Sequence, residues 1–181
     1  MRDGRPGGRT FDTRMDKVRA LGKGLAMNNI PSEPTAGRAT ESVIWFGGRL
    51  PSVDVLNAAQ GDTLHHHLGI ELVAVGDDFL TMRMPVDGRT RQPKGRLHGG
   101  ASVALAETVG SLAASCCVDP AVSAVVGLEI NANHLRPARQ GWVFGTARPE
   151  ALGRMVHVWS IRIEDEAGKL VAPGLFIPAA E

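Results

Sequence analysis

A single carboxylate stands on an apolar stretch of this chain. Residues 99–117 are small or apolar, most are good helix formers, and Glu107 is the only charged residue among them. A helix that is apolar on nearly all sides packs in a core, where desolvation raises the pKa of a carboxyl group and makes its charge costly. A raised pKa suits a general base or a nucleophile, so Glu107 is a catalytic candidate. The alternative is a carboxylate paired across a subunit interface without a catalytic role.

The start of the same helix offers hydrogen-bond donors. His98, Gly99 and Gly100 open the apolar run, and the first amides of a helix have no partner within it and lie at the positive end of its dipole. Such amides stabilise an oxyanion, and a glycine lets a ligand approach closely. Gly99 is therefore a candidate oxyanion donor. The alternative is that the two glycines only permit a tight junction between loop and helix.

The spacing of these two candidates predicts a dimer. Glu107 lies eight residues after Gly99, which is about 12 Å along a helix at 1.5 Å per residue. One chain cannot easily place both groups around the same carbonyl, whereas two antiparallel copies of the helix across a two-fold axis bring them together. Ser111 lies on the helical face of Glu107 and can orient the carboxylate or a water molecule. Close packing of a small residue is the alternative for Ser111.

Three consecutive histidines, His65–His67, raise the question of a metal site. In an extended segment neighbouring side chains point to opposite faces, so at most two of them converge. No Asp or Cys stands directly beside them, and we expect a surface or substrate-rim role and no metal site.

The remaining elements must hold this helix in place. Ser52 is expected to cap a short helix through Gln60, and a second short helix is expected over 13–27. Short turns indicate antiparallel neighbours, and Pro173 with Gly174 indicates an edge or a bulge in the last strand. We expect an α+β fold in which an antiparallel sheet of five to six strands wraps around one long central helix. The predicted strands span residues 68–75, 79–86, 124–135, 142–151, 155–164 and 169–177.

Composition sets the class of protein. The chain has 181 residues, 43% of them hydrophobic, and a net charge of +1, which predicts one soluble domain and gives no electrostatic reason to bind nucleic acid or an anionic membrane. No run of 18 apolar residues exists that could span a membrane. The two cysteines, Cys116 and Cys117, are adjacent, which is typical of a reducing compartment, so we expect a cytoplasmic protein.

The first part of the chain differs from the rest. Residues 1–40 hold 8 Lys and Arg against 4 Asp and Glu, which leaves 12 against 15 in the remainder. We expect residues 1–48 to form a flexible basic extension and residues 49–181 to form the folded domain. The alternatives for the extension are a tail that binds a partner and a translation start at Met15 or Met27.

A series of motifs in this domain resembles the hotdog-fold acyl-CoA thioesterases. The matching segments are Met84–Asp87, Arg89–Pro93, Leu97–Ser102, Leu105–Glu107, Gly110–Ser111 and Val126–His134. They are most similar to the phenylacetate-degradation subgroup, which includes 1,4-dihydroxy-2-naphthoyl-CoA thioesterase. The resemblance implies a homodimer or a dimer of dimers that hydrolyses an acyl-CoA thioester, with an aromatic acyl group expected, without a metal or redox cofactor.

The resemblance also implies roles for individual residues. Glu107 would be the catalytic carboxylate, as general base or nucleophile, and the N–H of Gly99 would be the oxyanion donor. Gln92 and His98 would hold the thioester, and Ser111 would assist on the helix. Further candidates for substrate contacts, mainly with the phosphates of coenzyme A, are His134, Arg136, Arg139, Lys94 and Arg154.

Departures from the family pattern leave alternatives open. Ala172–Leu175 and Arg154-Met155 stand where relatives carry small polar and basic residues, which puts contacts with the nucleotide in question. A non-catalytic acyl-CoA-binding module is one alternative function, and a dehydratase or hydratase of the same fold is another. The acyl pocket is expected among the side chains of Met82, Met84, Val125 and Trp142.

Overall fold

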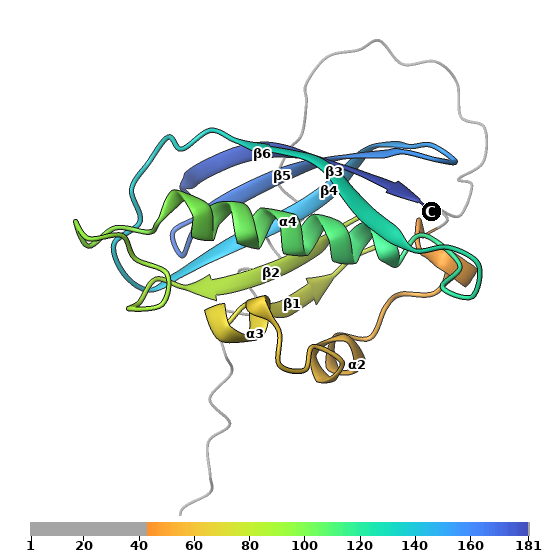
Figure 1. Ribbon diagram of the computed structural model, residues 1–181, viewed down its shortest axis with the longest axis horizontal. Coiled ribbons are helices and arrows are strands. Elements are labelled where there is room, and N and C mark those ends of the chain that lie inside the picture. Colours follow the sequence, from red (N-terminus) through yellow and green to blue (C-terminus); the bar gives the residue numbers. More distant parts are fainter. Residues whose placement is uncertain (1–42, 181) are drawn as a thin grey trace, which may run out of the picture. The chain divides into compact units, whose positions relative to one another are not determined.

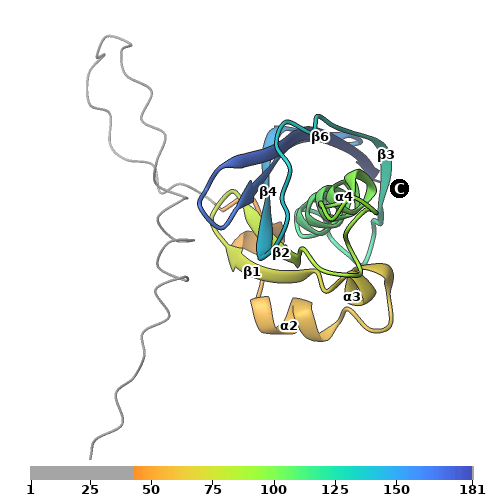
Figure 2. The same ribbon diagram turned by 90° about the vertical axis from the view of Figure 1, so that its left-hand side faces the viewer.

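A long helix, α4, lies within the curve of an antiparallel sheet (Figures 1 and 2). The computed structural model describes residues 43–180. The strands are β1 (Glu71–Val75), β2 (Leu80–Pro85), β3 (Val125–Ala132), β4 (Trp142–Leu152), β5 (His157–Asp165) and β6 (Leu170–Ala180), and their order in the sheet is β1-β2-β4-β5-β6-β3. The helical elements are η1 (Phe46–Gly48), α2 (Val53–Ala58), α3 (Leu64–Leu68) and α4 (Gly99–Ser115). The predicted fold class is confirmed.

The helix α4 is buried on one side only. The sheet covers the side that carries Leu105, Val109 and Ala113, each of which is fully buried. The other side is exposed or half-buried, because the described chain covers it only in part, with β3 beside it. That partly covered side carries Gly100, Val103, Ala104, Glu107, Thr108, Ser111, Leu112 and Ser115.

The core fills the space between the sheet and the covered side of α4. Burying a large aliphatic or aromatic side chain there stabilises the fold by about 1.5–3 kcal/mol. Met82 and Met84 are 1% and 0% exposed within this core, so the prediction that they line an acyl pocket is wrong. The largest fully buried side chains are those of Trp159, Phe176, Ile70, Leu72, Leu80, Met82, Met84, Leu105, Ile161, Ile163, Val109 and Val143.

The two edges of the sheet differ. At the β1 edge the side-chain amide of Asn57 donates to the carbonyl of Leu72 and accepts from its N–H, both at 2.9 Å. Asn57 lies in α2, and Ser52 caps the first turn of this helix as expected. At the β3 edge no element of the described chain pairs with the outer side, and Val126 and Leu128 are exposed. An exposed strand edge is a template for pairing with another chain.

The segment before β1 is helical and not extended. The predicted strand over 68–75 begins only at Glu71, because α3 includes His65–His67 and extends to Leu68. Gly69 ends α3 with a φ of 68°, a left-handed conformation that glycine adopts readily. The premise that these histidines alternate between two faces of a strand is therefore wrong.

The last strand is not at an edge. β6 lies between β5 and β3, and β3 pairs with β6 and not with its sequence neighbour β4. The bulge expected at these two residues is also absent, because Pro173 pairs with Arg162 and Gly174 pairs with Ile161 and Ala132 in regular register. The register shifts of β6 lie elsewhere, opposite Ile163/Glu164 of β5 and opposite Gly127/Glu129 of β3. Gly174 is required by a close approach, since a β-carbon there would lie 2.2 Å from the carbonyl oxygen of Asn131.

The predicted extension over 1–48 and the predicted helix over 13–27 fall wholly or mostly outside the described residues. Within residues 43–48, Trp45 is 3% exposed and its indole N–H donates to the carbonyl of Gly76 at 2.8 Å. No helix between residues 43 and 180 is long and apolar enough to cross a membrane.

Candidate active site

His98 caps the start of α4 with its side chain. Its Nδ1 accepts from the N–H of Gly100 at 2.9 Å, and its carbonyl accepts from Ala101 and Ser102. The neutral ring then carries its proton on Nε2, which is left as a donor. Within the described chain the Gly99 N–H forms no hydrogen bond. That amide, at the positive end of α4, is therefore available to a ligand.

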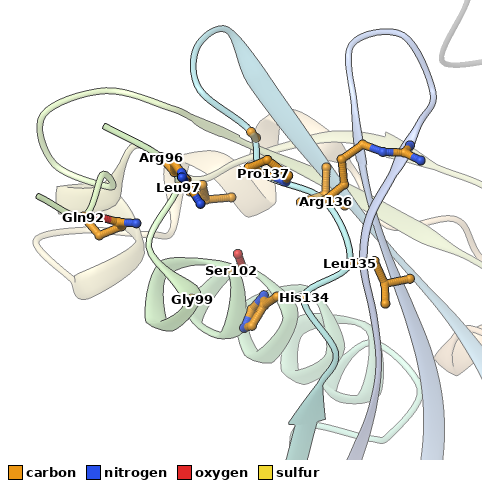
Figure 3. Close-up of a pocket in the computed structure, with 11 residues that line it drawn as sticks. Gln92, Arg96, Leu97, Gly99, Ser102, His134, Leu135, Arg136 and Pro137 are labelled. Carbon is orange, nitrogen blue, oxygen red and sulfur yellow. The ribbon is translucent and has the colours of Figure 1, made fainter. Parts of the chain in front are cut away.

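A pocket of about 310 Å³ opens at this helix start (Figure 3). It brings together Gln92, Gly99, His134 and Arg136, four of the candidates predicted from the sequence. The loop before α4 and the loop after β3 meet there, joined by a hydrogen bond from Leu97 N–H to the carbonyl of Ala138 at 2.8 Å. The full lining consists of Gln92, Arg96, Leu97, Gly99, Ser102, His134, Leu135, Arg136, Pro137, Ala138 and Val171.

Gln92 presents its amide NH₂ group as a donor. Its side-chain oxygen accepts from the backbone N–H of Lys94, and the backbone N–H of Gln92 donates to the carbonyl of Arg96 at 2.8 Å. The loop is fixed further by Thr90, which is 1% exposed and whose hydroxyl donates to the carbonyl of Pro85 at 2.6 Å. Because the oxygen is engaged, the NH₂ group is the part of the amide left for a ligand.

His134 lies over the start of α4. A β-carbon at Gly99 would lie 3.0 Å from Nε2 of His134, so the absence of a side chain at Gly99 leaves room for this ring. Figure 3 shows His134 in front of the helix and Ser102 on the helix side of the pocket. Ser102 is 1% exposed, and its hydroxyl has only a 3.5 Å contact with the carbonyl of His98.

Glu107 lies outside this pocket, on the partly covered side of α4. It is half-buried, and burial raises the pKa of its carboxyl above the ordinary value, while the nearby Ser111 hydroxyl lowers that pKa by a smaller amount. Ser111 is also outside the pocket. Within one chain the free N–H of Gly99 and the carboxylate of Glu107 are therefore apart, as their eight-residue spacing predicts.

The four predicted cationic contacts and Arg96 form no ion pair within residues 43–180. Arg96 and Arg136 line the pocket, whereas Lys94 and Arg139 are exposed on its two loops without lining it. Arg154 lies in the turn between β4 and β5, away from the start of α4 (Figure 1). Arg96 was not among the predicted contacts.

The other reactive side chains do not form a second catalytic centre. His67 lies 3.2 Å from Asp62, both exposed, and the described residues contain no group of three or more potential metal ligands. Burial raises the pKa of the Cys116 thiol to about 11 and, with Cys116 beside it, that of Cys117 to about 12. Both thiols are protonated near neutral pH and are poor nucleophiles.

Comparison with known proteins decides the family. The model of the thioesterase superfamily matches residues 94–172. A 1,4-dihydroxy-2-naphthoyl-CoA hydrolase from Escherichia coli is 48% identical over 128 residues, which is 71% of this chain and 92% of that protein. The chain belongs to the thioesterase superfamily. The proofreading thioesterase EntH from Cronobacter turicensis is 49% identical to this thioesterase over 127 residues, 70% of the chain and 90% of that relative.

Solved structures agree with this assignment. The crystal structure of the thioesterase HI1161 from Haemophilus influenzae superimposes with a TM-score of 0.73 at 46% identity. The match covers 76% of this thioesterase and 94% of that chain. The hotdog fold and the enzyme class, thioester hydrolase, are both confirmed.

Proposed function

We propose that this thioesterase hydrolyses aromatic acyl-CoA thioesters at composite sites of a homodimer, either alone or as half of a dimer of dimers. One subunit supplies the pocket with the Gly99 N–H, and the partner subunit supplies Glu107. The observation that carries this proposal is the separation of Gly99 from Glu107 within one chain. The free amide of Gly99 faces a pocket whose lining contains no carboxylate, and the carboxylate of Glu107 lies half-exposed beside β3, on the side of α4 that the rest of residues 43–180 leaves open.

The sheet edges support this assembly. Asn57 closes the β1 edge, whereas the β3 edge is open and carries exposed Val126 and Leu128. Glu107 lies beside this open strand, since a β-carbon at Gly127 of β3 would be 2.6 Å from its Oε1. Pairing two β3 strands across a two-fold axis covers both apolar edges and brings each Glu107 to the boundary between subunits.

The proposed reaction uses water and groups of the protein, with no cofactor. Glu107 removes a proton from water, the hydroxide attacks the thioester carbon, and the carbonyl electrons move to the oxygen. The N–H of Gly99 holds this oxyanion, assisted by the amide NH₂ of Gln92 and by Nε2–H of His98. The C–S bond then breaks, and the thiolate of coenzyme A takes the proton from Glu107. Direct attack by Glu107, with later hydrolysis of the anhydride, is the other route open to this carboxylate.

The apolar part of the pocket lining supports an apolar acyl group. The walls of the pocket include Leu97, Leu135 and Pro137, and its volume of about 310 Å³ is at the lower end of small-molecule sites. One relative carries the name 1,4-dihydroxy-2-naphthoyl-CoA hydrolase, an aromatic substrate. Both arginines that line the pocket, Arg96 and Arg136, have no acidic partner in the described chain and are available for the phosphates of coenzyme A.

The remaining predicted residues have different places in the proposed site. Lys94 and Arg139 lie on the loops that flank the pocket and extend its positive charge outward. Arg154 does not line the pocket of its own chain, and we assign it to the site of the partner subunit. Ser111 lies one turn from Glu107 and orients its carboxylate or the attacking water.

The test is release of free thiol from a panel of benzoyl-, hydroxynaphthoyl-, phenylacetyl- and fatty acyl-CoAs. We expect the aromatic esters to have the highest kcat/KM and Glu107→Gln to lose about 10²–10⁴-fold in kcat. The matched control is Glu150→Gln, an exposed glutamate on β4 with no ion pair, which should keep wild-type activity. Activity of Glu107→Gln within a few-fold of wild type would contradict the proposal. Tight binding without thiol release would favour a binding module, and product formation without thiol release a hydratase.

A further inference from the structure

Two glycines and one phenylalanine enclose the space next to Glu107. A β-carbon at Gly127 on β3 would lie 2.6 Å from Oε1 of Glu107 and 3.1 Å from Cε2 of Phe176. A β-carbon at Gly110 on α4 would lie 2.5 Å from Cδ1 of the same ring. Phe176 on β6 is 0% exposed. The ring therefore fills the space that the two glycines leave between helix and sheet, and both this ring and the Glu107 carboxylate lie close to Gly127.

The glycine at 127 is not explained by its backbone. Gly127 does not have a positive φ, so an alanine can adopt its conformation. A glycine inside a strand weakens that strand and marks a bulge or a place where another group approaches closely. Gly127 stands next to the register shift of β3, and other groups also approach it closely. The groups that approach here are the Glu107 carboxylate and the ring of Phe176.

We propose that Gly127 and Phe176 are positioning residues for Glu107. This inference rests on the catalytic role proposed for Glu107. Gly127 leaves the space that the carboxylate occupies, and Phe176 forms the apolar wall that keeps the carboxylate at the subunit boundary. Neither residue lines the pocket that holds Gly99, Gln92 and His134, so both act on the carboxylate and not on substrate binding.

The size of the expected effect follows from one distance. With alanine at 127, the carboxylate oxygen must move by about 0.8 Å, from 2.6 Å to the 3.4 Å at which ordinary contact begins. Misplacing a catalytic group by 1 Å lowers a rate by up to about 10²-fold. We therefore expect Gly127→Ala to lower kcat by about 10- to 100-fold while KM stays within about 3-fold. The matched control is Gly88→Ala, because no atom lies within 4 Å of a β-carbon there.

A double-mutant cycle separates positioning from damage to the fold. If Gly127 acts through Glu107, adding Gly127→Ala to Glu107→Gln changes the residual activity by less than about 2-fold, because the group it positions is already lost. Equal losses in both backgrounds would overturn the inference. A wild-type kcat for Gly127→Ala beside an inactive Glu107→Gln would overturn it as well, while leaving the proposed function standing. An active Glu107→Gln would remove the proposed function itself.

Phe176→Leu provides a second test that does not require Gly127→Ala to fold. A smaller side chain admits water to the carboxylate, so the acid limb of the kcat/KM profile should move to lower pH. Circular dichroism and size exclusion would establish that the fold and the assembly are retained. An acid limb at the wild-type pH in a folded Phe176→Leu protein would contradict the role given to Phe176.

Discussion

Replacing Gly99 by alanine is expected to change catalysis at the N–H of residue 99 much more than the stability of the fold. A β-carbon at this position would lie 3.0 Å from Nε2 and 3.4 Å from Cδ2 of His134. His134 is exposed and moves aside at little cost, while alanine favours a helix over glycine by up to about 1 kcal/mol. We therefore expect the free energy of unfolding of Gly99→Ala to lie within about 1 kcal/mol of the wild-type value.

Catalysis should respond very differently from stability. A carbonyl oxygen held by the Gly99 N–H must come within about 2.7–3.1 Å of the nitrogen, which places substrate atoms next to the α-carbon. The new methyl group lies in that space and displaces the carbonyl, so we expect kcat to fall by about 10- to 100-fold.

Thiol release from an aromatic acyl-CoA and urea unfolding measure the two effects. His134→Ala is the control background, since it removes the collision with the ring but not the methyl group from the path of the substrate, and the loss in kcat should persist there. A Gly99→Ala enzyme with kcat within 2-fold of wild type would refute the assignment of this amide as the oxyanion donor.

Three other properties of this thioesterase are open to measurement. The log of kcat/KM should rise with pH along an acid limb whose midpoint lies above the ordinary glutamate value of 4.5, because burial raises the pKa of Glu107 and only the ionised carboxylate accepts a proton; a limb at or below 4.5 would contradict this. Asn57→Ala leaves the N–H and carbonyl of Leu72 without their side-chain partner and should lower the free energy of unfolding by about 1–3 kcal/mol, measured with urea against Ser52→Ala as a second variant of α2. Alkylation of Cys116 and Cys117 by iodoacetamide at pH 8 should be much slower than that of a free thiol, because their pKa values are about 11 and about 12; rapid labelling of the folded protein would show that these thiols are accessible and ionised.

Much of the fold was predictable because its strongest signals are local. The apolar run over 99–117 gave α4 to within two residues, and turn residues bounded β1, β2, β4 and β5. The short helix α3 was missed, because five residues that include three histidines carry almost no helical periodicity. The pairing of β3 with β6 is a long-range contact, and no turn between neighbouring strands indicates it.

The site likewise has parts that local sequence predicts and parts that depend on long-range contacts. Gly99 and Glu107 stand on one helix, so their separation was fixed by helix geometry alone. The pocket depends on where the loop after β3 meets the loop before α4, and its contacts with Arg96, Ser102 and Val171 arise only in the folded chain. Gly127 did carry a usable signal, since a glycine within a strand marks a close approach, but the sequence does not say which side chain approaches.

The central claim is that each site takes its amide from one subunit and its carboxylate from the partner. Glu107→Gln and Gly99→Val each disable one half, and the two inactive proteins are unfolded together, refolded as a mixture and assayed for thiol release. Composite sites give each mixed dimer one intact site, and mixed dimers make up about half of the population, so activity should return to about one quarter of wild type. A mixture that stays as inactive as its two components, although mixed dimers are demonstrated by differently tagged chains, would contradict the account.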